Sequence, residues 1–112
     1  MQITRYSEAK PYEAMEHYDM RCLRLQGKEA TTTDTIWIGL SHILPGGRTS
    51  MMDAPVEKIY VVVAGEVVVE TATGTVTLGV LDSCRLAPGE ARARSNLTNA
   101  PASVLLAMPT TG

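Results

Sequence analysis

The sequence predicts a single all-β domain, built as a sandwich or as a small antiparallel barrel. Short apolar runs are separated by turns that contain Gly and Pro, as in strands joined by hairpins. No longer stretch shows the amphipathic period of a helix. A chain of 112 residues has the length of one domain, and its core is small enough that a second chain can help to cover it.

The turn signals place the strands in chain order. The strongest signal is Pro45-Gly46-Gly47, and Ala64-Gly65-Glu66 separates two apolar strands. We expect strands at residues 20–26, 35–44, 58–63, 67–71, 75–79, 84–86, 91–96 and 102–108. The expected organisation is a polar N-terminal arm over residues 1–18 with a short helical turn near 12–15, a barrel over 19–109 and a tail over 110–112.

Composition argues against nucleic-acid and membrane partners. The formal net charge is -2, which provides no attraction to phosphates, and the few aromatic residues form no stacking surface for bases. No apolar run approaches the length of a membrane span, and the N-terminal residues lack the apolar segment of a signal peptide. We therefore expect a cytoplasmic protein, in which Cys22 and Cys84 are free thiols rather than a disulfide or part of a zinc site.

Two stretches resemble the motifs of the cupin superfamily. Pro45-Gly46 followed by residues 57–66, EKIYVVVAGE, is similar to the first motif, in which a PG turn precedes an HxH pair, a Glu and an apolar hairpin. Residues 81–96 are similar to the second motif, which runs from a Gly-Asp turn through a Pro-x-Gly turn and a His to an Asn. The resemblance implies a small RmlC-like barrel, or jelly roll, that usually forms a homodimer.

The metal ligands of the cupin motifs are replaced in this chain. The equivalent positions hold Lys58 in place of the Glu, Arg92 in place of the second-motif His, and Met52 with Ala54, or Met51 with Asp53, in place of the HxH pair, whereas the Asn is retained as Asn96. Lys and Arg are cations and cannot coordinate a divalent ion. We therefore expect neither a metal nor another cofactor. One alternative stays open, in which a bulge turns Glu57 inward to join Asp53 or His42 in an atypical metal site.

Strand alternation predicts which side chains share a face. Two such faces are Lys58 with Tyr60 and Val62, and Arg92 with Arg94 and Asn96; the resemblance implies that the second lines the barrel mouth. The strand before the Pro-Gly-Gly segment offers two competing faces: Ile38, Leu40, His42 and Leu44, or Trp37, Gly39, Ser41 and Ile43. We expect the face with His42 to point inward.

The predicted pocket is cationic and therefore needs a counter-charge. Asp53, Glu57 or Glu90 supplies it through structural ion pairs, or a small anionic metabolite does. Arg is suited to a bidentate hold on a carboxylate, and a desolvated Lys beside an Arg has a lowered pKa, which suits proton transfer. The predicted catalytic residues are Lys58, His42 and Tyr60, and the predicted substrate-binding residues are Arg92, Arg94, Met52 and Asn96.

Three functions are compatible with this pocket. The first is a metal-independent isomerase, epimerase or decarboxylase of a small organic carboxylate, in which Arg92 anchors the anion and Lys58 moves protons with His42 or Tyr60. The second is a non-catalytic module that binds a small anion. The third is a degenerate barrel with a structural or interaction role. His17 lies on the polar arm and is expected to be exposed to solvent.

Overall fold

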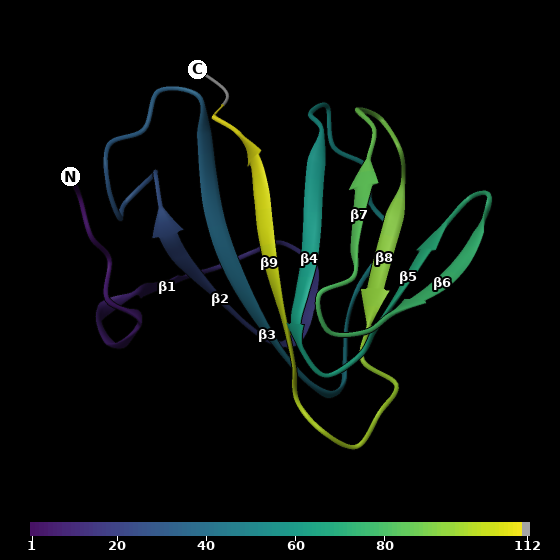
Figure 1. The fold of residues 1–112 in the computed structure, drawn as a ribbon. Helices are drawn as coiled ribbons and strands as arrows, with labels where there is room; N and C mark the ends of the chain where they lie inside the picture. The colour runs from purple at the N-terminus through teal and green to yellow at the C-terminus, as the bar shows by residue number, and fades with distance from the viewer. Residues whose placement is uncertain (111–112) are drawn as a thin grey trace.

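The computed structural model describes residues 1–110, in which the strands form one antiparallel sheet that curves into a nearly closed barrel (Figure 1). The predicted all-β barrel is therefore confirmed. No helix of these residues is long and apolar enough to cross a membrane. The elements are η1 (Tyr6–Glu8), β1 (Lys10–Tyr12), β2 (His17–Gln26), β3 (Ile36–Thr49), β4 (Lys58–Ala64), β5 (Val67–Thr71), β6 (Gly74–Leu78), β7 (Ser83–Leu86), β8 (Arg92–Ser95) and β9 (Ala102–Pro109).

Every predicted strand is present, and the differences lie mainly in the N-terminal part. Residues 10–12 of the predicted arm form β1, which pairs with β2. The short helical turn expected near residues 12–15 is absent, and a 3-10 turn lies at Tyr6–Glu8 instead. Residues 111–112 of the predicted tail lie outside the described residues.

β3 takes part in both walls of the barrel. The strand order is β6-β5-β8-β3-β9-β4-β7. Outside this order, β2 pairs with β3 on one side and with β1 on the other. Residues 36–43 of β3 pair with β9, whereas Arg48 near its end pairs with Ser95 of β8. In Figure 1, β2, β3, β9 and β4 lie along one wall and β5, β6 and β8 along the other.

The Pro-Gly-Gly segment bends β3 and does not end it, so the predicted turn is wrong. The β2–β3 register passes from Met20↔Ile43 to Tyr18↔Arg48, which leaves residues 44–47 opposite the single residue Asp19. Asp19 (φ 53°) and Gly46 (φ 81°) adopt the left-handed conformation. At Gly47 a Cβ atom would lie 2.6 Å from the Asp19 carbonyl oxygen, so only glycine permits this approach. We call Asp19 together with residues 44–47 the double bulge.

Asn96 fastens the double bulge to β8. Its side chain is fully buried, and its Nδ2 donates to the carbonyl oxygens of Ile43 at 3.0 Å and Ala100 at 2.8 Å. Its backbone N–H donates to the Gly47 carbonyl, and its own carbonyl accepts from the Gly46 N–H, both at 2.9 Å. The bend in β3 thus keeps its backbone groups paired although it leaves the regular ladder.

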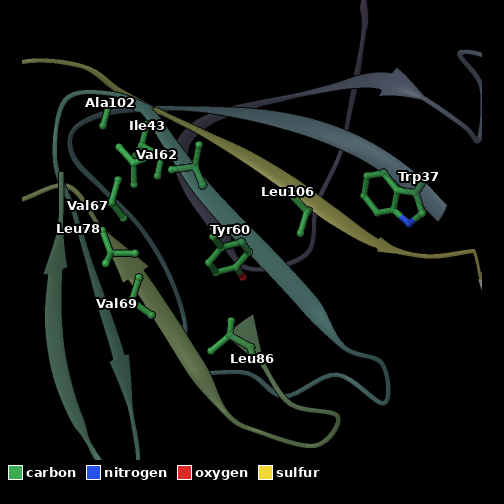
Figure 2. Packing of buried hydrophobic residues seen from close by; sticks show 11 residues of the cluster. Trp37, Ile43, Tyr60, Val62, Val67, Val69, Leu78, Leu86, Ala102 and Leu106 are labelled. Atoms are coloured by element: carbon green, nitrogen blue, oxygen red, sulfur yellow. The ribbon is translucent and has the colours of Figure 1, made fainter. Parts of the chain in front are cut away.

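The apolar core fills the end of the barrel beside the double bulge. Figure 2 shows Ile43, Val62 and Val67 gathered there, while Trp37 stands apart at the other end. Ile43 and Val62 are fully buried. The ring of Tyr60 lies between these two regions, with its hydroxyl directed away from the Ile43 group. Tyr60 and Trp37 also line a cavity, which is described below.

We predict that Asn96→Ala lowers the free energy of unfolding by about 2–4 kcal/mol, because the buried Ile43 carbonyl loses its donor and the bonds of Asn96 to Ala100 and Thr98 are lost as well. Urea denaturation measures this change. Asn99→Ala is the matched control, because Asn99 is exposed on the same loop and an exposed substitution changes stability by about 0.5 kcal/mol or less. If the two variants unfold alike, Asn96 does not hold the bulge.

Candidate functional site

A cavity of about 300 Å³ adjoins the apolar core, since Trp37, Tyr60 and Leu106 belong to both. Its lining comes from β1, β2, β3, β4, β8 and β9, together with the segments that follow β1, β2 and β3. Five of its side chains are basic, and among the described residues that line it Glu13 is the one carboxylate. We call it the cationic cavity; its basic residues are Arg24, Lys28, Lys58, Arg92 and Arg94.

The structure brings five of the predicted site residues together in this cavity. They are Lys58 and Tyr60 from β4, Arg92 and Arg94 from β8, and Met52 from the loop between β3 and β4. Their side chains reach it by the strand alternation that the sequence predicts, since the burial of β8 alternates with Arg92 and Arg94 on its inner face. Catalysis or binding by these residues stays a prediction.

Arg92 and Arg94 are almost completely buried, with 7% and 3% of their surface exposed. Nη1 of Arg92 donates to the Met52 carbonyl at 3.2 Å, and its Nε donates to the Tyr60 hydroxyl at 3.5 Å. The guanidinium of Arg94 lies 4.7 Å from the centre of the Tyr60 ring, and its Nη2 is 3.3 Å from Nε2 of His17. Neutral partners therefore fix both guanidinium groups.

Within residues 1–110, no carboxylate forms an ion pair with Lys58, Arg92 or Arg94, which we call the cation cluster. The carboxylates proposed as counter-charges lie elsewhere: Glu57 pairs with Arg85, Glu90 accepts from the Ala87 N–H, and Asp53 is exposed. Buried charge without a partner is unfavourable. The described residues therefore leave the charge of the cluster unbalanced.

Lys58 is the member of the cation cluster with a shifted protonation equilibrium. Burial lowers its pKa to about 8, and the positive charges of Arg92 and Arg94 act in the same direction. Both causes disfavour the ammonium form. Most of Lys58 is therefore still protonated near neutral pH, but its neutral fraction is much larger than that of an ordinary lysine.

His42 does not reach the cavity, because β3 points its other face inward. Trp37 lines the cavity and Ile43 lies in the apolar core, so the competing face of the strand is the inner one. On the outer face, Nε2 of His42 is 2.8 Å from the Tyr6 hydroxyl, and its Nδ1 is 2.8 Å from the Ser103 hydroxyl. We therefore no longer assign His42 to the site with Lys58.

The side chain of Asn96 is used by the fold. Besides the two bonds that its Nδ2 donates to Ile43 and Ala100, its Oδ1 accepts from the N–H of Thr98 at 2.9 Å and from the Thr98 hydroxyl at 2.7 Å. Asn96 does not line the cationic cavity. We correct its predicted role from substrate binding to a structural one.

The sequence reasoning missed His17, which lines the cavity instead of facing solvent. If β2 alternated regularly from Met20, Tyr18 would point inward and His17 outward. Asp19 interrupts the alternation, so Tyr18 is 44% exposed and His17 is half-buried beside Arg94. No local sequence signal shows that Asp19 adopts a positive φ, although Asp tolerates it better than most residues.

A second missed group is a stack of one cation and two aromatic rings. The guanidinium carbon of Arg24 lies 3.6 Å from the ring centre of Tyr12 and 4.4 Å from that of Trp37. Nε of Arg24 also pairs with Glu29 at 2.9 Å. Burial raises the pKa of Tyr12 to about 12, which keeps its hydroxyl protonated. Arg24 is thus neutralised and held, unlike the cation cluster.

The donor set of the cavity does not fit a divalent metal ion. The cupin ligand positions are occupied here by Lys58 and Arg92, which line the cavity as cations, and by Met52. No group of three or more His, Cys, Asp or Glu side chains in residues 1–110 is arranged to hold a metal. Glu57 is paired with Arg85, so the bulge that would have turned it inward is not found.

The fold is that of cupin structures. The polyketide cyclase RemF of Streptomyces resistomycificus matches with a TM-score of 0.87 and 14% identity over 97% of this chain and 79% of that chain. A predicted oxalate decarboxylase of Thermotoga maritima matches with a TM-score of 0.80 and 20% identity over 99% of this chain and 100% of that chain. A cupin-2 domain of Rhodospirillum rubrum matches with a TM-score of 0.82 and 9% identity over 96% and 74% of the two chains.

The chain thus has the fold of cupin structures, whose motifs its sequence resembles. It belongs to the same family as the protein named beta-D-galactosidase Rv1717 of Mycobacterium tuberculosis. The two are 42% identical over 106 residues, which cover 95% of this chain and 91% of the relative. No protein-family model matches the chain.

We predict that the rate at which an acylating reagent labels Lys58 reaches half of its maximum near pH 8, which we call the half-labelling pH. The neutral amine is the nucleophile, and the pKa of Lys58 is about 8. Arg92→Gln should raise this half-labelling pH, since a neighbouring positive charge is removed. Mass spectrometry of labelled peptides across pH measures it, with exposed Lys10 as the internal reference. Half-labelling of Lys58 only above about pH 10 would show that the cavity does not perturb it.

Proposed function

We propose that the cationic cavity binds a small organic carboxylate and that Lys58 and Tyr60 exchange protons with it. The protein would then be a metal-independent isomerase, epimerase or decarboxylase. One observation carries this proposal: the cation cluster is buried around a cavity, and among the described residues it has no carboxylate partner. A ligand carboxylate would complete the charge balance that the protein leaves open.

The chemistry of the two proton-transfer groups supports an enzyme. A neutral Lys58 amine can take a proton from the carbon next to a carboxylate, and the electron pair then delocalises onto the carboxylate oxygens, where guanidinium groups stabilise it. Tyr60 can return a proton to the opposite face of that carbon, which is an epimerisation. The hydrogen bond from Nε of Arg92 to the Tyr60 hydroxyl stabilises the phenolate that this step leaves.

Two alternatives use the same fold without this chemistry. A binding module needs only the cations and the apolar wall, and it would hold the carboxylate without exchanging protons. A degenerate structural barrel would be filled by side chains, with its cations paired to protein carboxylates. The cavity of about 300 Å³ and the unpaired cation cluster support a ligand over the degenerate barrel.

A second candidate function is hydrolysis of β-galactosides, which the name of the 42% identical relative suggests. Glycoside hydrolysis usually needs two carboxyl groups, one as acid and one as base or nucleophile. Of the described residues that line the cavity, Glu13 alone carries a carboxyl group, and it is exposed. The usual two-carboxylate arrangement is therefore not met, so we place this function second.

We also propose that the protein works as a cytoplasmic homodimer. The family resemblance implies a dimer, and Ile36 and Leu44 on the outer face of β3 are 49% and 53% exposed, which a second copy could cover. Cys22 and Cys84 are both free thiols, as expected in a reducing compartment.

We predict that at least one of acetate, lactate, succinate and galacturonate binds in the cavity, and that Arg92→Gln weakens its binding about tenfold or more, because a charge-assisted hydrogen bond is lost. NMR titration measures the affinity. Arg85→Gln is the matched control, since Arg85 is exposed and outside this cavity. If none of the four binds to the wild type, the proposed function is wrong.

Deuterium exchange separates the enzyme from the binding module in the same samples. For lactate, succinate or galacturonate in D₂O, the enzyme would replace the hydrogen next to the carboxylate with deuterium. Lys58→Gln should abolish this exchange, whereas Lys10→Gln should retain it. Binding without exchange would leave the binding module as the function.

We predict that the wild type hydrolyses p-nitrophenyl β-D-galactoside poorly or not at all, because the cavity lacks the second carboxyl group. Release of p-nitrophenol measures the rate, and the corresponding galacturonide, which adds a carboxylate, is the companion substrate. Hydrolysis of the galactoside that Glu13→Gln abolishes would instead favour the second function. Hydrolysis of the galacturonide alone would mean that the protein hydrolyses glycosides and that the cation cluster selects those that carry a carboxylate.

A further inference from the structure

Two hydrogen bonds determine the protonation state of His17. Nδ1 lies 2.7 Å from the carbonyl oxygen of Met15, and a carbonyl can only accept, so Nδ1 carries the hydrogen. Nε2 lies 3.3 Å from Nη2 of Arg94, and a guanidinium can only donate, so Nε2 presents its lone pair. Both contacts are satisfied by one form only, the neutral ring with its hydrogen on Nδ1.

The surroundings of His17 agree with this form. Burial lowers the pKa of His17, and the charges of Arg94, Lys58 and Arg92 lower it further, while the bond to Met15 opposes them. His17 is therefore a neutral acceptor placed among cations. It enters the cavity because of the positive φ of Asp19, which breaks the alternation of β2.

Arg94 is left with a donor that the described protein does not use. Nη2 is taken by His17, and the guanidinium lies over the Tyr60 ring. Nη1 is buried and makes no hydrogen bond with any residue of 1–110. Buried donors are nearly always paired, so each exception needs a partner. Arg94 is only 3% exposed and lines the cationic cavity, so Nη1 becomes available to a ligand oxygen there once the side chains that cover it move.

We propose that His17 is the positioning residue of a carboxylate subsite at Arg94. By accepting from Nη2, His17 fixes the guanidinium against Tyr60 and leaves Nη1 as the donor that binds the carboxylate. This inference rests on the proposed function, because it assigns the anchoring of the same anion. It adds that Arg94, positioned by His17, binds the carboxylate together with Arg92, which leaves Lys58 and Tyr60 free to act on the rest of the ligand.

The test uses a matched pair of variants in the full chain. His17→Leu keeps most of the volume and removes the acceptor, whereas His17→Gln can still offer its Oε1 to Nη2. NMR titration with acetate, lactate, succinate and galacturonate should show about tenfold weaker binding for His17→Leu, and binding by His17→Gln within about threefold of the wild type. Tyr18→Ala controls for disturbance of the strand, since Tyr18 is the exposed neighbour.

A double-mutant cycle separates positioning from direct contact. If His17 acts through Arg94, His17→Leu weakens binding in the wild type but adds nothing once Arg94→Gln is present. Additive effects, or a His17→Gln variant as weak as His17→Leu, would overturn the proposal. Wild-type protein that binds none of the four carboxylates would refute the proposed function itself, whereas binding that depends on Arg94 and not on His17 would refute this inference alone. Circular dichroism confirms that each variant is folded.

Discussion

The close approach of Gly47 to the Asp19 carbonyl is the contact on which the rest of the structure depends. It allows β3 to bend without ending, so that one strand pairs with β9 in one wall and with β8 in the other. Asn96 then ties the bend to β8 through side-chain and backbone bonds. The same contact reverses the direction of side chains in β2. The barrel closure and the composition of the cavity therefore share one cause.

The basic side chains of the protein have two kinds of partner. The ion pairs formed within residues 1–110 involve Arg24 and Arg85, whereas Arg92 and Arg94 are held by a carbonyl, a hydroxyl, an aromatic ring and an imidazole. Neutral partners fix the position of a cation without cancelling its charge. Such an arrangement costs stability in the empty barrel and strengthens the attraction for an anion, which is the usual compromise at a binding site.

Much of the fold could be predicted from the sequence, because hairpin turns and apolar strands are local signals. The same is true of Lys58, Tyr60, Arg92 and Arg94, whose grouping needs only regular alternation within β4 and β8. The misplaced residues lie on β2 and β3, where alternation is broken or ambiguous. His17 was missed because Asp19 adopts a positive φ where it packs against Gly47, a tertiary contact that no local pattern reports. His42 was misassigned because both faces of β3 are apolar.

The bulge at Asp19 determines which side chains of the first residues of β2 enter the cavity. Upstream of it, one residue more or fewer would exchange the side chains that enter the cavity, replacing an imidazole by the phenol of Tyr18, while the core beyond Met20 kept its register. The lining of the cavity can thus be changed by the length of a peripheral segment instead of by substitutions in the core.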